Sequence, residues 1–346
     1  MKLFAGLDVS LEKTAVCIED DAGKIVWEKK VDSEPEALAE ALSPWRASIV
    51  LVGLEACPLS EWIFRGLATA GFEVRCLETR HAQRFLSTRP NKTDKNDARG
   101  IANMMRLGHF KPVHMKSGQA IYLRTLLTGR KQLIAAMLKI EATIRGLLRV
   151  YGLKMGETHR ARFEARVGEL VAEVPALALA LDPLMIARNV MRQQKRRFDY
   201  ALEKLARADE VCLRLMTVPG VGPITAIAFK STIDDPKRFA SSKAVGAHLG
   251  LAPRVYQSGE IDHTGHVSKC GDVMMRYYLY EAATVFLTRD KRWSALKAWG
   301  VRVAKRHGFK RARVAVARKL AIVLHQIWVR GETFRFTSQT EVAGAS

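Results

Sequence analysis

The order of strand-like and helix-like segments in the first eighty residues is the feature that most restricts the fold. Three short apolar stretches come first, and "DAG" separates the second from the third, which is typical of a hairpin turn. Helix-like and strand-like segments then alternate. The predicted strands are residues 2–10, 13–20, 24–32, 48–55 and 73–79, and the predicted helices are residues 34–45, 59–71 and a stretch that ends near Gly108. A β-meander followed by alternating β and α segments predicts a mixed α/β domain.

Four acidic residues lie where such a domain would bring them together. The order of elements indicates a ribonuclease H-like α/β fold over residues 1–113, in which Asp8 and Glu55 end two strong apolar strands. Asp94 and Asp97 are three residues apart, so on a helix both point from one face. Carboxylates gathered at one place repel one another unless cations join them. Hard oxygen ligands select Mg²⁺ or Mn²⁺, and two such ions can clamp a phosphodiester.

These residues also have other interpretations. Asp8 could end a strand as a turn former, and Asp94 could be a helix N-cap. A rival function starts from "GLDVSLEKTAVCIED", which is similar to the phosphate loop of sugar-kinase and actin-like ATPases. Such a loop needs small Gly or Thr residues where this chain has Ser10 and Leu11, and no second Asp-Gly-rich phosphate loop follows. The metal site is therefore favoured.

The charge of the chain points to a polyanionic partner. Fifty-six Lys and Arg oppose 35 Asp and Glu, which gives a formal net charge of +21. Nucleic acid is the favoured partner, because basic side chains release counterions from phosphates. A length of 346 residues favours two or three units.

Cysteine usage and hydropathy indicate a cytoplasmic protein. The five cysteines are scattered and form no CxxC pair, which argues against a zinc ribbon or a disulfide framework. We find no apolar run of membrane-spanning length and no N-terminal signal pattern. We therefore expect no membrane partner.

Heptad patterns predict two long helices within residues 114–212. The first series is Leu126, Leu133, Ile140 and Leu147, with Met137, Ile144 and Tyr151 interleaved, and the second is Met191, Phe198, Leu205 and Cys212. Pro175 and Pro183 are expected in the connection between them. This spacing predicts an α-helical coiled coil that serves oligomerisation, and a layer of an ordinary helical bundle is the alternative.

The remaining part, residues 213–346, is predicted to be mainly α-helical and strongly basic. Residues 291–330 contain twelve Lys or Arg and no acidic residue, which favours a phosphate-facing surface. Residues after Phe336 are expected to be disordered. The basic residues expected at nucleic acid are Lys305, Arg306, Lys310, Arg311 and Arg313.

A second motif, "GLAPRVYQSGEIDHTGHVSKCGD", lies in this part and is rich in glycine, hydroxyl groups and basic residues. Ser258 follows Arg254 and Tyr256 on a glycine-flanked turn. A serine there could attack a phosphate that a guanidinium holds, although "QSG" is also an ordinary turn. Ser268 is the rival nucleophile.

The chain resembles the DEDD transposases of a large bacterial insertion-sequence family, which are related to Piv-type DNA invertases. The resemblance runs through "GLDVS", "GLEAC", "NKTDKNDAR", "VPGVGPITA", "GLAPRVYQSG" and "GHVSKCGD", and so spans nearly the whole chain. Where many relatives have "EATG" or "EASG", this chain has "EACP", which leaves the glutamate in place.

The resemblance implies a RuvC-like nuclease domain with Asp8, Glu55, Asp94 and Asp97 as metal-binding catalytic residues. It also implies a C-terminal transposase domain in which Ser258 becomes joined to DNA. It further implies homo-oligomers, dimers or tetramers, and a noncoding RNA that guides the choice of DNA. "VPGVGPITA" resembles a helix-hairpin-helix turn, whose amides around Gly220 and Gly222 could hold a backbone phosphate, and a purely structural helix-turn-helix is the alternative. Arg254 and Lys269 are the other nucleic-acid contacts expected.

The sequence therefore predicts an insertion-sequence transposase or site-specific recombinase. Its DNA partners would be element ends or a circular junction, and a target. The alternative is a junction-resolving, metal-dependent endonuclease in which water is the nucleophile. A third class, a noncatalytic nucleic-acid-binding protein, would make the acidic cluster incidental.

Overall fold

The computed structural model describes residues 1–87, 91–172, 174–258 and 261–336. The tail expected to be disordered lies outside these residues. The chain forms two compact units, Met1–Lys116 and Ser117–Ser346, and each is described by itself. In the described part of the chain, no helix is both long and apolar enough to cross a membrane.

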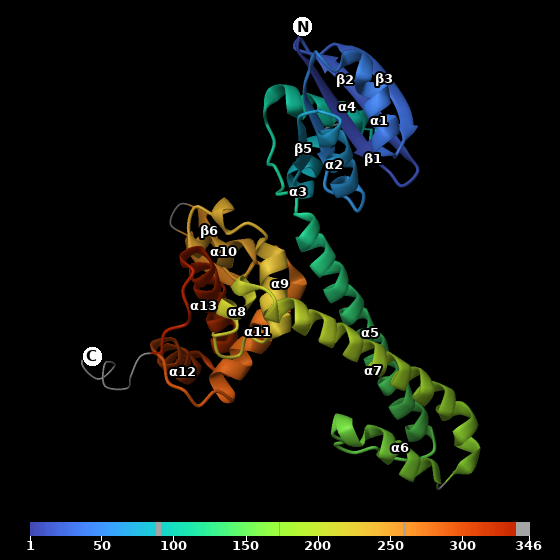
Figure 1. Ribbon diagram of the computed structural model, residues 1–346, viewed down its shortest axis with the longest axis vertical. Helices are drawn as coiled ribbons and strands as arrows, with labels where there is room; N and C mark the ends of the chain where they lie inside the picture. Colours follow the sequence, from blue (N-terminus) through green and yellow to red (C-terminus); the bar gives the residue numbers. More distant parts are fainter. Residues whose placement is uncertain (88–90, 173, 259–260, 337–346) are drawn as a thin grey trace. The chain divides into compact units, whose positions relative to one another are not determined.

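The first unit is built on a five-stranded sheet with the order β3-β2-β1-β4-β5 (Figure 1). β1 pairs antiparallel with β2, and β2 with β3, whereas β1, β4 and β5 run parallel. The strands are β1 (Leu3–Val9), β2 (Lys13–Asp20), β3 (Ile25–Asp32), β4 (Ile49–Glu55) and β5 (Val74–Leu77). The mixed α/β arrangement that the sequence predicts is therefore confirmed, including the antiparallel meander.

Helices cover both faces of this sheet. On one face, α1 (Pro35–Leu42) and α2 (Ser60–Thr69) bury leucines and isoleucines against alternate residues of the strands. On the other face, α4 (Asp94–Leu107) packs against β1, β2 and β4. The helical stretch predicted before Gly108 is thus two helices, because α3 (Thr79–Leu86) precedes α4.

Two glycines let α4 approach the sheet closely. A side-chain Cβ at Gly6 on β1 would overlap the backbone of α4 at Ala98 and Ala102. One at Gly53 on β4 would lie 2.7 Å from the side chain of Met105 and 2.9 Å from that of Ile101. Gly6 pairs with Gly53 across the parallel strands, so the two form a flat floor beneath α4.

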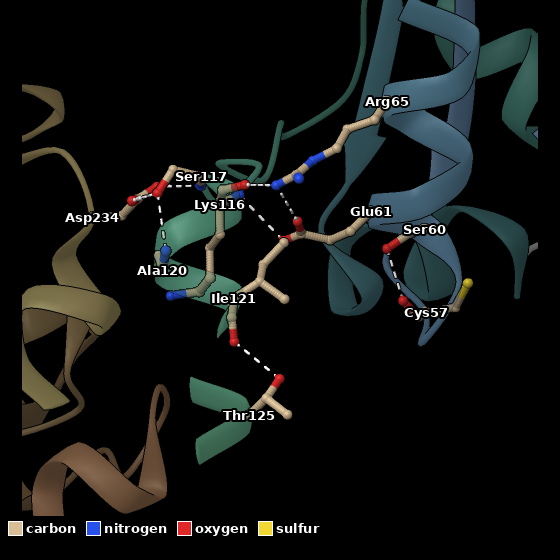
Figure 2. Close-up of polar contacts among 10 residues, drawn as sticks. All are labelled: Cys57, Ser60, Glu61, Arg65, Lys116, Ser117, Ala120, Ile121, Thr125 and Asp234. Atoms are coloured by element: carbon tan, nitrogen blue, oxygen red, sulfur yellow. Dashed lines mark hydrogen bonds and ion pairs between the residues drawn. The ribbon is translucent and has the colours of Figure 1, made fainter. Parts of the chain in front are cut away.

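The boundary between the units carries a polar anchor on each side. At the end of the first unit, the Lys116 amide donates to Glu61 Oε1 (3.2 Å) and its carbonyl accepts from Arg65 Nη2 (2.6 Å), as Figure 2 shows. At the start of the second unit, Ser117 donates from its amide (2.8 Å) and its hydroxyl (2.5 Å) to Asp234 (Figure 2). The Ser117 hydroxyl also caps the first helix of that unit by accepting from Ala120.

The second unit begins with two long helices, α5 (Gly118–Val150) and α7 (Ala178–Arg207), which are joined through α6 (Phe163–Ala172). Arg130 pairs with Asp199, and Glu141 pairs with Arg188 (2.8 Å), so the helices run antiparallel. Figure 1 shows them side by side. The two long helices predicted from the heptads are therefore present.

The buried positions of α5 agree only in part with the predicted heptad series. Leu126, Leu133, Ile140 and Leu147 are half-buried, whereas the interleaved Met137 and Ile144 are buried, together with Leu123, Leu127, Glu141 and Leu148, which the series did not include. Cys212 lies in the separate helix α8 (Glu210–Leu215). The expectation that Pro183 lies in the connection is wrong, because it lies inside α7. As the sixth residue of α7, Pro183 lacks the amide that would donate to the carbonyl of Leu179. Coiled-coil geometry stays a prediction.

The rest of the second unit is mainly helical, as the sequence predicts. Helices α8, α9, α11 and α13 share one hydrophobic core with the nearer ends of α5 and α7. The elements are α9 (Pro223–Ile233), α10 (Ser242–His248), β6 (Pro253–Ser258), β7 (Ile261–Val267), α11 (Val273–Thr288), α12 (Ala295–His307) and α13 (Phe309–Arg330). Strands β6 and β7 form an antiparallel hairpin. Short 3₁₀ turns lie at Ser43–Trp45, Arg160–Arg162, Pro175–Leu177 and Pro236–Arg238.

Candidate active site

Asp8 and Glu55 lie side by side at one edge of the first unit's sheet. In the parallel pair β1–β4, Gly6 pairs with Gly53 and Leu7 with Leu54, so Asp8 and Glu55 occupy the next position. Because side chains alternate along a strand, both carboxylates are on the face that α4 covers. Both side chains are half-buried.

The first turn of α4 brings two more carboxylates to this edge. Thr93 is the N-cap, and its hydroxyl accepts from the Asn96 amide (3.2 Å). Asp94 is therefore the first helical residue and not the cap, and Asp97 follows within the same turn. Acidic residues in the first turn are favourable beside the positive end of the helix dipole.

The pKa of Asp8 shows that the four carboxylates act on one another. This pKa is raised from 3.8 to about 6, chiefly by burial and then by the negative charges of Asp97, Asp94 and Glu55, in that order of size. The Lys92 ammonium opposes this rise. Since each neighbouring charge makes ionisation harder, a cation placed among these oxygens would be strongly favoured.

Glu55 is perturbed in the same direction. Burial is the largest cause of its raised pKa, and the charge of Asp97 adds to it. A hydrogen bond from Thr79 and the charge of Lys92 act against the rise. Glu55 and Asp8 therefore share two charged neighbours, Asp97 and Lys92, which belong to one short segment of the chain.

Asp94 is in a different electrostatic state. Its carboxylate accepts from the Lys30 ammonium at 2.6 Å, and this hydrogen bond holds the pKa of Asp94 below its usual value. Lys30 comes from β3, on the same face of the sheet. Asp94 thus has a cationic partner of its own.

The donor set fits a divalent cation chemically. It consists of carboxylate oxygens, the ligands that Mg²⁺ and Mn²⁺ prefer, and the raised pKa of Asp8 reflects their crowding. Within the described ranges, however, no three His, Cys, Asp or Glu side chains stand close enough to hold an ion as they are. One of the four carboxylates, that of Asp94, contacts the Lys30 ammonium instead.

Ion pairs fix α4 on the sheet beside this site, and sequence reasoning missed them. Glu28 on β3 accepts from Arg99 through both carboxylate oxygens and also pairs with Lys95 (2.9 Å). The hydrogen bond from Arg99 is the main reason why the pKa of Glu28 is lowered to about 2. Farther along the helix, Arg106 pairs with the buried Glu19. The charges of these residues were visible in the sequence, but their partners depend on strand register.

The second motif lies on the β6–β7 hairpin of the second unit. Ser258 is the last residue of β6 and is exposed, as are Arg254 and Tyr256 at alternate positions of the strand. Arg254 donates to the Ser268 carbonyl (3.3 Å). The rival nucleophile Ser268 is half-buried, and its hydroxyl accepts from the Cys270 amide. Of the two serines, Ser258 is the more accessible to a substrate.

The predicted nucleic-acid contacts divide into exposed and packed residues. Gly222 is the exposed N-cap of α9, whereas a Cβ at Gly220 would overlap the carbonyl of Ala282, so Gly220 serves close packing. Arg313 is half-buried, with its guanidinium over the rings of Tyr280 and Phe309. The exposed basic residues are Lys269, Lys305, Arg306, Lys310 and Arg311.

Comparison with protein families identifies both units as parts of transposases. A DEDD transposase model of the IS110 type, described as "Transposase", matches residues 5–152 and so includes the four acidic residues. A second model, described as "Transposase IS116/IS110/IS902 family", matches residues 212–298 and so includes Ser258. Together the two matches cover more than half of the chain.

Individual transposases are similar to this chain over most of its length. The transposase for insertion sequence element IS1111A of Coxiella burnetii is 28% identical over 95% of this chain and 90% of its own length. A putative transposase of Sinorhizobium fredii is 29% identical over 82% of this chain and 74% of its own length. The transposase for element IS1328 of Yersinia enterocolitica is 28% identical over 82% and 85% of the two chains.

Among solved structures, RuvC of Thermus thermophilus matches 32% of this chain and 99% of its own, with 15% identity and a TM-score of 0.25. The two family matches and the relatives that align over most of the chain show that it is a DEDD transposase and belongs to the IS116/IS110/IS902 family.

Proposed function

We propose that this transposase cuts and rejoins DNA by metal-assisted transesterification, with Ser258 as the nucleophile. The observation that supports the acidic half of the proposal is the raised pKa of both Asp8 and Glu55, to which the charge of Asp97 contributes in each case. The same part of the chain lies within the matched DEDD transposase region. The alternative is a nuclease in which water is the nucleophile, and a search for a covalent protein–DNA adduct distinguishes the two.

Asp8, Glu55, Asp94 and Asp97 would hold Mg²⁺ or Mn²⁺. When bound, the ions would stabilise negative charge on the phosphate and on the leaving oxygen. The chain's own residues contribute the carboxylate cradle, and α4 sets its shape because its first turn carries two of the four ligands. In this proposal Asp94 exchanges its contact with Lys30 for the ion.

Ser258 would supply the attacking oxygen. Its Oγ forms a bond to phosphorus, the scissile P–O bond breaks, and the hydroxyl proton is lost as the leaving oxygen gains one. The exposed position of Ser258 at a strand end, with Arg254 on the same strand, supports this role. A guanidinium can bind two phosphate oxygens and so orient the phosphorus for attack.

The partners follow from the same proposal. The DNA substrates would be element ends or a circular junction, together with a target, and a noncoding RNA from the element would guide their choice. The protein would act as a dimer or tetramer in the cytoplasm, where its five free cysteines stay reduced. The division into a catalytic domain (1–113), a helical oligomerisation region (114–212) and a transposase domain (213–346) is part of this proposal, as is the relationship to Piv-type invertases.

The test is a search for protein joined covalently to DNA. Element-end DNA, Mg²⁺ and candidate RNA are incubated with the full chain, and the products are separated on a denaturing gel. We expect an adduct with the unaltered chain and with Ser268→Ala, and none with Ser258→Ala or Asp97→Asn. Strand cleavage by Ser258→Ala without an adduct would show that water is the nucleophile.

A further inference from the structure

Lys30 lies in line with the acidic site across three strands of the sheet. Asp8 on β1 pairs with Ala15 on β2, and Ala15 pairs with Lys30 on β3. Paired residues share a face of the sheet, so all three side chains lie on the side that α4 covers. The short side chain between the two charged ones leaves space for the ammonium of Lys30 to reach Asp94 Oδ2 at 2.6 Å.

The neighbouring ion pairs make this contact a fixed feature of the fold. Glu28 lies two residues before Lys30 on the same strand face and binds Arg99 and Lys95 of α4. The first turn of α4 is therefore held above β3, and Asp94 cannot easily move away from the lysine as a rigid part of the helix. Only a change of side-chain conformation separates the pair.

The pair is also weak enough to be displaced. The side chains of Lys30 and Asp94 are 60% and 51% exposed, and water screens an ion pair in such a position. The competing group is a divalent cation, which carries twice the charge and can bind several carboxylates at once. A divalent cation at Asp94 would therefore compete with Lys30 for this carboxylate.

We propose that Lys30 is a built-in competitor of the metal ion at Asp94. In the metal-free protein it neutralises this carboxylate, and metal binding displaces it. It therefore sets the concentration of divalent cation at which the site fills. This inference rests on the metal site of the proposed function, and it concerns a residue outside the four carboxylates.

Lys29 provides a matched control. It carries the same charge, is exposed and precedes Lys30 on β3, but it pairs with Val16 and so belongs to the opposite face of the sheet. Lys29→Met and Lys30→Met change the net charge equally. A difference between the two variants therefore reports the contact with Asp94 and not the overall field of the protein.

The first measurement is a titration of the full-length chain with Mn²⁺ at neutral pH. The electron paramagnetic resonance signal of free Mn²⁺ reports how much of the metal is bound. We expect Lys30→Met to tighten binding by up to about fivefold, which corresponds to the loss of one exposed ion pair of about 1 kcal/mol. Lys29→Met should change the dissociation constant by less than about twofold.

The second measurement follows the amine itself. Acylation of Lys30 by a water-soluble succinimidyl ester, quantified by peptide mass spectrometry, should become faster when Mn²⁺ is added, because the ammonium leaves Asp94. Acylation of Lys29 should not change. In Asp94→Asn, Lys30 should react at the faster rate with or without Mn²⁺.

The outcomes separate the two proposals. Equal Mn²⁺ affinities of the Lys30→Met and Lys29→Met variants, with the unaltered chain binding Mn²⁺, would overturn the role of Lys30 and leave the metal site standing. Weaker binding by Lys30→Met would also overturn it, because the lysine would then support the metal. A chain that binds no Mn²⁺ at all would overturn both.

Discussion

Asp8 is the residue at which the acidic site most affects the energetics of the fold. Burial and the charges of Asp97, Asp94 and Glu55 raise its pKa to about 6, so at neutral pH it is ionised in unfavourable surroundings. Enzymes often accept such local destabilisation where a ligand later relieves it. Metal binding would supply that relief here, because it adds positive charge where the carboxylates repel one another.

The first prediction uses this pKa. The folded chain holds the Asp8 proton more tightly than the unfolded chain, whose Asp has a pKa near 3.8, so Asp8 contributes stability that is full below pH 4 and lost as pH rises through 6. The Asp8→Asn variant cannot ionise at this position, so it does not lose this stability as the pH rises. Without divalent metal, the variant should gain on the order of 1–2 kcal/mol relative to the unaltered chain between pH 4 and pH 8, after allowance for screening. Urea unfolding at several pH values measures it.

A control for this prediction comes from the metal. Mg²⁺ should raise the unfolding free energy of the unaltered chain at pH 8 more than that of Asp8→Asn, since ligands stabilise the state that binds them. If the unfolding free energies of the two proteins changed equally with pH, the pKa of Asp8 would not be raised in the folded chain, and the prediction would be wrong.

Sequence reasoning works well for the residues at strand ends and poorly for their partners. Asp8 and Glu55 follow apolar strands, and parallel neighbours place such ends together, so their proximity was predictable. Lys30 was not, because its contact with Asp94 joins residues 64 positions apart and depends on the register of β3. Local sequence patterns predict which face of a strand a side chain occupies, but they do not predict which residue of another element it contacts.

At the scale of elements, the position of α4 on the sheet decides whether the four carboxylates meet. Gly6 and Gly53 form the floor under this helix, and the ion pairs from Glu28 and Glu19 fix it laterally. A helix displaced by one methyl group would carry Asp94 and Asp97 with it. The close packing is therefore as much a part of the site as the acids.

The second prediction tests this floor. Gly6→Ala places a methyl group against the backbone of α4, and overpacking of this kind typically destabilises by about 1–3 kcal/mol. It should also weaken Mn²⁺ binding, since two of the four proposed ligands, Asp94 and Asp97, move away from the other two. Thermal unfolding and Mn²⁺ titration measure the two effects.

Gly146 is a suitable control for the alanine substitution. It lies inside α5, is exposed, and a Cβ there would meet no described atom within 4 Å. Gly146→Ala should leave Mn²⁺ binding unchanged and stabilise its helix by up to about 1 kcal/mol. Unchanged metal affinity in Gly6→Ala would mean that α4 can shift without disturbing the ligands.

The long helices show the limit of periodicity as a guide. Heptads in the sequence predicted that α5 and α7 exist, and they do, but the positions that become buried are set by the partner helix. The buried pair of Glu141 with Arg188, whose guanidinium also lies 4.6 Å from the ring of Phe163, has no hydrophobic signature. A polar pair 47 residues apart becomes visible only once the helices are paired.

At the scale of the whole molecule, a net charge of +21 includes basic residues of two kinds. Some hold the fold: Lys297 is buried and donates to the Asp290 carbonyl, Lys319 lies over Trp299, and Arg313 packs between rings. Others are exposed and can bind phosphates. Composition alone cannot separate the two kinds, which is why the sequence placed Arg313 among the nucleic-acid contacts.

The last prediction follows from that separation. Lys305, Arg306, Lys310 and Arg311 are exposed at the junction of α12 and α13, and they should neutralise DNA or RNA phosphates. Replacing all four by Gln should weaken binding and lower the salt dependence, the slope of log K against log salt, by up to about four. Filter binding at salt concentrations between about 50 and 300 mM measures the affinity and the slope.

A control with the same loss of charge replaces Lys131, Lys139, Arg149 and Arg196, which are exposed residues of α5 and α7. If the control flattens the slope as much as the first variant, the long helices carry nucleic acid, or the interaction depends on total charge and no defined surface exists. If only the first variant does, the phosphates lie against the end of α12 and the start of α13. Arg313→Gln should instead lower the thermal stability while leaving the slope nearly unchanged, because its guanidinium is engaged by Tyr280 and Phe309.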